Sequence, residues 1–410
     1  MTHDTGTATA KQRSTAVSSA EGRLKVDMVD KIYLLDSTIT PLTALLTNVG
    51  KSYDGKTWQG QGMQKRITDN PEFKLLEDKY GGRYAKVVGT YTDPLVACTI
   101  TVTGAGTSPA YIFTIGDILI NKRTGERMEV ETVASSTTIT IAAGGRSIGS
   151  TAAAQGADGD GLYIIGNASE EGATARNVNS TRSATQSNYT QIFRNTFSVT
   201  NTEKAINLYG GRDLPYQRAK KGVEHARDVE RAFIFGEKGS TTGTNGHPKK
   251  YTGGVLEHLE TGSGYIQDQG GAITAPDFET FLREGFTYGS TEKILFASGV
   301  ILSAVSEMAR GQIQMRPKET SYGMKISQWE SPHGMINIVK HPFFVEDWSG
   351  YAMLLDMTSY GYRFIAGRDT SLETNVQAND ADGQTDQYLT ECGLERNNAP
   401  QNALLKGVIG

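Results

Sequence analysis

Residues 211–236 read GRDLPYQRAKKGVEHARDVERAFIFG, a pattern that predicts one long helix from about Leu214 to Phe235. Pro215 suits the first turn of a helix, where its missing N–H is not needed, and Gly236 suits the position after the last turn. Apolar residues recur at the spacing of a single helix face: Tyr216, Ala219, Val223, Ala226, Val229 and Phe233. We therefore expect a spine-like helix whose narrow apolar seam lies across other elements.

The remaining positions of this helix are mostly charged, and we expect them to face solvent, Glu230 and His225 included. Oppositely charged residues three positions apart support the helix: Lys221/Glu224, Glu224/Arg227, Arg227/Glu230 and Asp228/Arg231. If the seam is buried, replacing Val223 with Asp places a carboxylate there without a partner and costs a few kcal/mol.

C-terminal to the helix the chain alternates strands and helices, which predicts a compact α/β subdomain. We expect a Gly/Thr loop over Glu237–Lys250, a helix over Asp277–Phe286 and a second helix over Val300–Arg310. Ser298 is a candidate N-cap of the second helix, and Gly311 is its candidate end. The predicted strands of this half are Lys293–Phe296, Ile336–Val339, Ala352–Met357, Tyr362–Ile365 and Gln387–Cys392.

N-terminal to the helix, a small all-β module is expected between Thr92 and Gly166, because short β-branched runs alternate there with turns. The runs are Cys98–Thr103, Ile115–Ile120, Met128–Val133, Thr137–Ile141 and Leu162–Ile165. Polar stretches bracket this module, so it has the character of an insertion. Beyond it, Glu170–Gln191 is polar and predicted to be extended, and Ile192–Val199 is strand-like.

The first 91 residues contain little that could form a core of their own. Residues 1–28 are rich in Thr, Ser and Ala and predict a flexible arm. A short apolar docking segment with one or two helical turns is expected between Ile32 and Leu46, and a polar loop over Lys51–Gly62. Phe73, Leu75 and Leu76 predict a short strand that Gly81 and Gly82 end.

Composition limits the class of protein. The 410 residues suffice for two or three domains, but only 37% are hydrophobic and 47 are glycine, which predicts much exposed, extended structure. Lys and Arg number 41 against 45 Asp and Glu, a net charge of −4. Proteins that bind nucleic acid along their length are usually basic. If this near-neutral chain meets a genome, we expect it to do so as the wall of a container.

The two cysteines, Cys98 and Cys392, lie far apart and predict free thiols in a reducing compartment. The N-terminus lacks the apolar run of a secretory signal, and no stretch reaches the roughly 20 apolar residues of a membrane span. We therefore expect a soluble protein made in the cytosol.

A search for chemistry yields no candidate site, so we predict no catalytic, cofactor-binding or metal-binding residues and no cofactor. The Gly-rich stretch Gly236–Gly246 has Lys238 in the wrong place for a phosphate loop, and Gly104–Gly106 lies among strands. The six histidines show no metal-ligand spacing: His3, His225, His247, His258, His333 and His341. The carboxylate pairs Glu77-Asp78, Glu170-Glu171 and Glu346-Asp347 are expected in loops or at strand ends, where solvated faces are the default.

Read in order, the pieces are a flexible arm, an extended excursion that carries a β insertion, a spine helix, an α/β subdomain and returning strands. That order resembles the HK97-like major capsid proteins of tailed bacteriophages, and in particular the major head protein family typified by phage SU10. The stretches that carry the resemblance are Pro71–Tyr80 (PEFKLLEDKY), Glu171–Ala173 with Thr190–Phe193, Gly211–Gly236, and Tyr251–Gly254 (YTGG) with Phe278–Gly289.

The resemblance implies an α+β chain with the HK97-like capsid fold and an inserted small all-β domain. Its parts would be an N-terminal arm (1–30), the start of the peripheral domain and the outbound extended loop (31–91), the insertion (92–166) and the returning loop (167–200). The spine helix with the peripheral domain (201–273), the axial domain (274–334) and returning strands of both domains (335–410) would follow. The insertion lies outside the family's minimal pattern.

The function implied is structural: hexamers and pentamers of one chain would form an icosahedral shell around double-stranded DNA in a virion, after synthesis in the bacterial cytoplasm. Implied partners are a separate scaffolding protein, a portal protein and decoration proteins. The arm is too short to carry the larger helical scaffolding segment of some relatives. We expect the polar excursion Thr174–Tyr189 to contact neighbouring subunits, and the insertion to lie on the outer surface and bridge them.

Two alternatives remain open at this point. The shell of an encapsulin-like bacterial nanocompartment shares the fold and would contain protein cargo instead of DNA. A carbohydrate-binding or hydrolytic protein is the rival of a different class, and only the β insertion supports it.

Overall fold

The computed structural model describes residues 40–47, 65–78, 80, 82–91, 96–104, 109–149, 154–176, 183–206, 212–312, 316–321 and 324–409. The chain divides into two compact units. The body unit comprises residues 1–74 and 187–410, and the barrel unit comprises residues 75–186. The predicted arm (1–30) and the loop Lys51–Gly62 lie outside the described residues.

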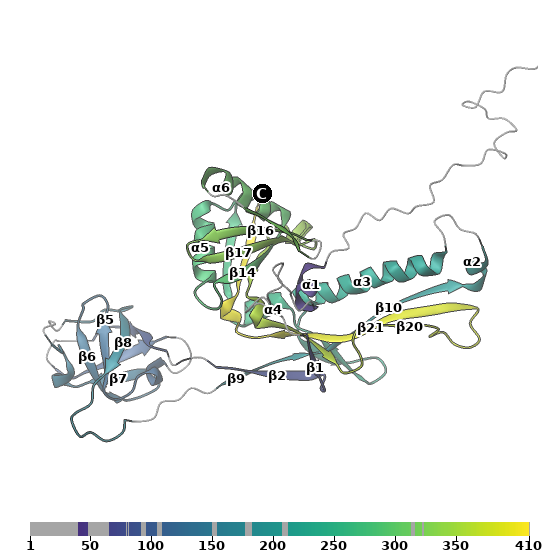
Figure 1. The fold of residues 1–410 in the computed structure, drawn as a ribbon. Helices are drawn as coiled ribbons and strands as arrows, with labels where there is room; N and C mark the ends of the chain where they lie inside the picture. Colours follow the sequence, from purple (N-terminus) through teal and green to yellow (C-terminus); the bar gives the residue numbers. More distant parts are fainter. Residues whose placement is uncertain are drawn as a thin grey trace, which may run out of the picture. The chain divides into compact units, whose positions relative to one another are not determined.

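A long helix on a sheet forms one part of the body unit (Figure 1). The helix is α3 (Asp213–Phe235), and strands β1, β19, β21 and β10 follow one another in the sheet, with β20 paired to β21. Their bounds are Lys65–Thr68, Tyr360–Ile365, Gly383–Arg396, Gln191–Thr200 and Ser371–Glu373. Phe193, Phe197 and Val199 alternate along β10 and are buried, as expected for a strand with one covered face.

A second sheet of seven strands forms the other part of the body unit, in the order β13-β22-β18-β14-β17-β16-β15. These strands span Tyr265–Gly271, Ala403–Val408, Ala352–Leu355, Glu292–Ala297, Gly334–Lys340, Met324–Ser331 and Arg316–Ser321. Helices α5 (Ala275–Gly285) and α6 (Gly299–Gln312) pack on it with Phe281, Leu282 and Ile301. The strands predicted for this half are therefore present, but they serve two different sheets.

The predicted helices are confirmed with small differences at their ends. Helix α5 begins with a capping box between Thr274 and Asp277, and the hydroxyl of Ser298 accepts the N–H of Ile301 at 3.2 Å at the start of α6. Helix α6 runs to Gln312, so Gly311 does not end it. Gly236 follows α3 as predicted, with φ −65°, which is not left-handed.

The face of α3 that is buried agrees with the predicted seam at Val229 and Phe233 but differs from it elsewhere. Ala219 and Ala226 are exposed and Val223 is half-buried, whereas His225 and Glu230, expected in solvent, are buried. The buried face is set by polar partners on neighbouring strands and not by apolar spacing alone. Because Val223 is only half-buried, Val223→Asp is expected to cost less stability than the same substitution at a fully buried position of the helix.

Several elements were missed by the sequence prediction. The Gly/Thr loop is a β-hairpin of β11 (Gly239–Thr242) and β12 (Pro248–Tyr251). Short helices α2 (Asn201–Ala205) and α4 (Val255–Thr261) and strands β13, β15, β16 and β22 were also not predicted. Most are short or polar, so periodicity cannot reveal them. Helix α1 (Pro41–Thr47) lies in the docking segment and confirms the helical turns expected there.

The barrel unit contains a closed barrel in the strand order β3-β4-β7-β6-β5-β8. The strands are Tyr84–Val88, Cys98–Thr103, Thr138–Ile141, Arg127–Val133, Asp117–Asn121 and Gly161–Asn167. Its first strand lies before Thr92, since Tyr84–Val88 pairs with both β4 and β8. Inward-facing residues such as Leu119, Met128, Ile139 and Leu162 are fully buried and fill the interior.

Buried charges in the barrel are paired. The side chains of Glu126 and Arg146 are fully buried and join through Arg146 Nε and Glu126 Oε1 at 2.6 Å. Asp160 pairs with Arg123, and Asp117 pairs with Arg176. Three acidic residues of the barrel unit, Asp117, Glu126 and Asp160, are therefore neutralised by arginines.

A two-stranded ribbon of β2 (Glu72–Glu77) and β9 (Ala184–Tyr189) crosses the boundary between the units. The polar excursion Thr174–Tyr189 is expected to make its contacts with neighbouring subunits. Asn188, which is 1% exposed, is instead buried within its own chain. The reason is that its amide satisfies backbone groups inside the body unit.

Candidate functional site

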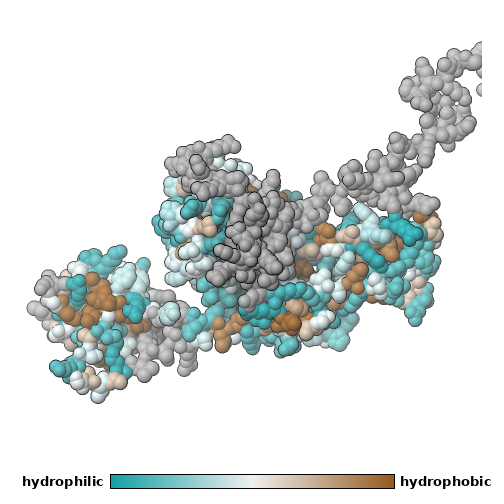
Figure 2. Space-filling model, viewed as in Figure 1, coloured by the Kyte–Doolittle hydropathy of each residue, from teal (hydrophilic) through white to brown (hydrophobic). Residues whose placement is uncertain are grey.

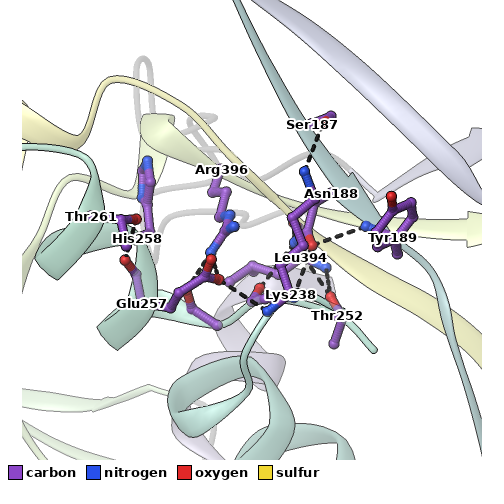
Figure 3. Close-up of polar contacts among 12 residues, drawn as sticks. Ser187, Asn188, Tyr189, Lys238, Thr252, Glu257, His258, Thr261, Leu394 and Arg396 are labelled. Atoms are coloured by element: carbon purple, nitrogen blue, oxygen red, sulfur yellow. Dashed lines mark hydrogen bonds and ion pairs between the residues drawn. The ribbon is translucent and has the colours of Figure 1, made fainter. Parts of the chain in front are cut away.

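Asn188 is the centre of an extensively bonded polar site in the described part of the body unit, which we call the Asn188 junction (Figure 3). Its Nδ2 donates to the carbonyl oxygens of Gly253 at 2.9 Å and Leu394 at 2.7 Å. Its Oδ1 accepts the N–H groups of Gly253 at 2.8 Å and Tyr189 at 2.9 Å. One side chain thus fixes β9 to both the YTGG turn and β21.

The Thr252 hydroxyl extends the junction. It accepts the N–H of Leu394 at 3.2 Å, while the N–H of Thr252 donates to the Gln191 side chain at 3.1 Å. Close by, the N–H of Thr190 donates to the carbonyl oxygen of Pro71 at 2.9 Å. Both strands of the ribbon are therefore attached to the body unit close to the point where the chain passes into the barrel unit.

Three glycines allow the backbone segments of the junction to approach one another. A Cβ on Gly236 would lie 2.6 Å from the Thr252 carbonyl oxygen, and one on Gly254 would lie 2.8 Å from the Ile234 carbonyl oxygen. A Cβ on Gly253 would meet Arg396 Nη1 at 2.6 Å. These contacts give a physical reason for the YTGG stretch and for the glycine after α3.

An ion pair lies beside the glycines. Arg396 Nη1 donates to the Gly254 carbonyl oxygen at 3.0 Å and also to the Glu257 carboxylate, which accepts the N–H of Lys238 at 3.3 Å. The Lys238 ammonium reaches the Ser187 hydroxyl at 2.7 Å and lies over the Tyr189 ring (Figure 3). The hairpin base, α4 and β9 are thus held together by charge.

His258 of α4 lies buried beside this pair, with Nδ1 3.4 Å from the Tyr360 hydroxyl. Burial, and secondarily the Arg396 cation, lowers the pKa of His258 to about 4. Burial also lowers the pKa of His225, although Asp228 opposes this shift. The His225 ring is held by Asn195 and Thr390, both at 2.7 Å. The solvated position predicted for His225 is therefore wrong.

We expect the protein to lose stability as pH falls from 6.5 towards 4. The folded pKa of His258 lies below its unfolded value, so folding favours the neutral form, and this stabilisation is present above pH 6.5. Protonation of this one group would cost about 2 kcal/mol at pH 5. The measurement is the melting temperature of wild type and His258→Gln at pH 7 and pH 5. An equally large acid-induced decrease in both proteins would contradict the assignment.

A second anchoring site lies on α3 at Glu230. Its carboxylate accepts the N–H groups of Leu42 at 2.7 Å and Thr43 at 2.6 Å, both in the first turn of α1. His341 Nε2 lies 3.0 Å from the same carboxylate. Because His341 Nδ1 accepts the N–H of Phe343, its Nε2 carries the proton and donates to Glu230.

Glu230→Ala should destabilise the protein by about 3 kcal/mol, because it leaves buried donors of α1 and His341 without an acceptor. Glu224→Ala on the same helix is the matched control. Glu224 is only half-buried and pairs with Lys221 on the surface, so its loss should cost less than about 1 kcal/mol. Urea unfolding of the two variants measures the difference, and equal midpoints would refute the anchoring role.

The other residues singled out in the sequence do not gather into a reactive site. His333 lies 2.9 Å from Glu279, His247 is exposed, and His3 lies outside the described residues. Both thiols are free and buried, and burial raises the pKa of Cys392 to about 12. In the ranges that the structure describes, no three His, Cys, Asp or Glu side chains are placed to hold a metal ion.

No helix in those ranges is both long enough and apolar enough to cross a membrane. Sequence reasoning missed Asn188 and Glu230, since a single Asn in a polar stretch and a single Glu on a charged helix carry no pattern. The YTGG stretch was the only signal near the junction.

Comparisons with known proteins find similarity to phage capsid, GTA capsid and encapsulin proteins. The chain is 26% identical over 318 residues to the major capsid protein of Pseudomonas phage PaMx41, covering 72% of this chain and 74% of that protein. The capsid of a native GTA particle aligns over 96% of this chain and 100% of its own, at 10% identity and a TM-score of 0.46. The SrpI encapsulin of Synechococcus elongatus aligns over 55% of this chain and 76% of its own, at 12% identity and a TM-score of 0.42.

The family model for the SU10 major capsid protein matches residues 3–408 and so includes both units. Its extent, together with a long helix on one sheet and a separate helix-covered sheet, confirms the predicted α+β class and HK97-like capsid fold. The chain therefore belongs to the SU10 major capsid protein family and is a major capsid protein of a tailed bacteriophage.

Proposed function

We propose that this capsid protein forms hexamers and pentamers of an icosahedral head shell that encloses double-stranded DNA, and that it performs no catalysis. The observation that carries the proposal is the family match across residues 3–408. The near-neutral net charge of −4 favours the role of a container wall over that of a protein that binds nucleic acid along its length. Synthesis in the host cytoplasm belongs to the same proposal.

The two parts of the body unit are proposed to have different places in the capsomer. We assign the five-stranded sheet with α3 to the peripheral domain and the seven-stranded sheet with α5 and α6 to the axial domain. Strands β17, β18 and β22 then belong to the axial part and β19 and β21 to the peripheral part, although all lie beyond Gly334. The N-terminal arm, extended loop and outward-facing insertion keep the roles expected from the sequence.

We further propose a separate scaffolding protein, a portal protein and decoration proteins as partners. Electron microscopy of particles from the chain expressed with and without its scaffolding protein tests the shell. Analysis of their contents separates a genome container from a compartment with protein cargo. Closed shells with nuclease-protected double-stranded DNA in complete virions are expected, and a uniform protein cargo would contradict the proposal.

The polar excursion is proposed to contact neighbouring subunits. Asn188 attaches β9 to the rest of the body unit, so the deletion that tests the contact with neighbouring subunits must end before Ser187. Removing residues 177–183, which keeps the Arg176–Asp117 pair of the barrel, should leave the melting temperature of the free subunit nearly unchanged and abolish closed shells. Size-exclusion chromatography and electron microscopy report the two outcomes, and normal shells from the deletion would refute the contact.

A further inference from the structure

The outer face of the barrel carries a group of large apolar side chains that we call the tyrosine patch. Its members lie on β3, β8 and β5: Tyr84, Tyr163, Ile165, Ile118 and Ile120. Tyr84, Tyr163 and Ile165 are 40%, 38% and 50% exposed. Hydrophobic residues gather on this side of the barrel over β5 and β8 in Figure 2, which is viewed as in Figure 1.

Strand register makes the patch continuous. Tyr84 pairs with Tyr163 across β3 and β8, and Tyr163 pairs with Ile120 across β8 and β5. The two tyrosine rings touch, with centroids 4.5 Å apart. Gly161 lies beneath them, where an added Cβ would lie 3.0 Å from the Tyr84 ring and 3.2 Å from the Tyr163 ring.

The barrel interior does not require these side chains. Alternate residues on the same strands, such as Ala85, Leu119 and Leu162, point inward and are fully buried. The patch therefore contributes apolar surface on the outside of a core that is already filled. Contiguous exposed apolar surface of this kind marks interaction sites.

Charges on either side of the patch are complementary. Lys86 lies on β3 at one side, and Glu129 lies on β6 at the other. Both face outward, and within the described residues neither forms an ion pair. In a contact between two barrels related by a two-fold axis, every residue pairing occurs twice. Lys86 of each barrel can therefore lie against Glu129 of the other.

We propose that the tyrosine patch is the contact site for the barrel of a second copy of this chain, related by a two-fold axis. The inference rests on the proposed shell, in which copies of the chain lie side by side, and it names the surface that joins them. Two features favour a protein surface over a sugar as the binding partner. The two tyrosine rings are tilted by 35° to each other, and the other residues of the patch are aliphatic, whereas a sugar would stack on an open aromatic face.

The test uses shells assembled from the full-length chain, with half of the subunits isotopically labelled. Carbodiimide should join Lys86 to Glu129 in peptides of mixed label, which only an intermolecular contact can produce. Lys86→Glu and Glu129→Lys should each lower the dissociation temperature of the shells and decrease barrel cross-linking at least several-fold. The double variant Lys86→Glu/Glu129→Lys should restore both. Tyr163→Lys should weaken the contact, whereas Thr99→Lys on exposed β4 should not.

The outcomes separate the two proposals. If the wild-type chain forms no shells even when it is expressed with its scaffolding protein, the proposed function fails and this contact fails with it. If shells form but mixed-label cross-links are absent and the double variant is no better than the single ones, only the barrel contact is overturned. Weakening by Tyr163→Lys without rescue by the charge exchange would show that the patch binds something other than a second copy.

Discussion

Arg146→Met is expected to destabilise the barrel unit by about 3–5 kcal/mol, because it leaves the Glu126 carboxylate buried without its partner. Arg146 also donates to the Ala154 carbonyl oxygen at 3.1 Å and lies 5.2 Å from the centre of the Tyr91 ring. Hydrogen exchange on the full chain is the measurement. Protection of β3 to β8 should fall while α3 and β10 keep theirs.

Two further variants show whether the isolated charge causes the loss. Arg146→Met/Glu126→Leu removes both charges and should recover much of the stability, since apolar replacements of buried pairs are often neutral. Lys122→Met changes an exposed neighbouring cation and should have little effect. A double variant as unstable as Arg146→Met would mean that packing, and not the unpaired carboxylate, controls this core.

Asn188→Leu is expected to cost at least about 3 kcal/mol and to prevent shell formation. The leucine keeps most of the volume but leaves the N–H and C=O of Gly253 and the C=O of Leu394 without their side-chain partner in a buried site. The ribbon of β2 and β9 would then lose its attachment to the body unit. Differential scanning calorimetry gives the loss of stability, and electron microscopy gives the loss of shells.

Ser187→Ala is the matched control at the adjacent position. Ser187 contributes one hydrogen bond to Lys238, and its removal should cost less than about 1.5 kcal/mol and leave assembly intact. If Asn188→Leu assembled as well as Ser187→Ala did, the Asn188 junction would have no role in positioning the extended segment.

The long periodic helices could be predicted from the sequence because their period and their terminal residues agree. Pro215 and Gly236 mark the ends of α3 almost to the residue, and Thr274 and Asp277 form the capping box of α5. The barrel strands could be predicted because short runs rich in β-branched residues, such as Cys98–Thr103, lie between Gly-rich turns.

The polar interior could not be predicted, because a buried charge is defined by partners far away in the sequence. Glu230 is 188 residues from Leu42 and 111 from His341, and Asn188 is 206 from Leu394. On a charged helix such a residue has the same local pattern as its solvated neighbours. The assignment of β18 and β19 to different sheets also depends on tertiary pairing, which local propensity does not encode.

A cryo-electron microscopy reconstruction of assembled wild-type particles shows whether copies of this chain build a closed shell. We expect an icosahedral shell of hexamers and pentamers, with α3 and its sheet in the peripheral part of each subunit and density for the barrel in contact with a neighbour. Discrete monomers or dimers under all assembly conditions, or an open filament in place of a closed shell, would contradict the account.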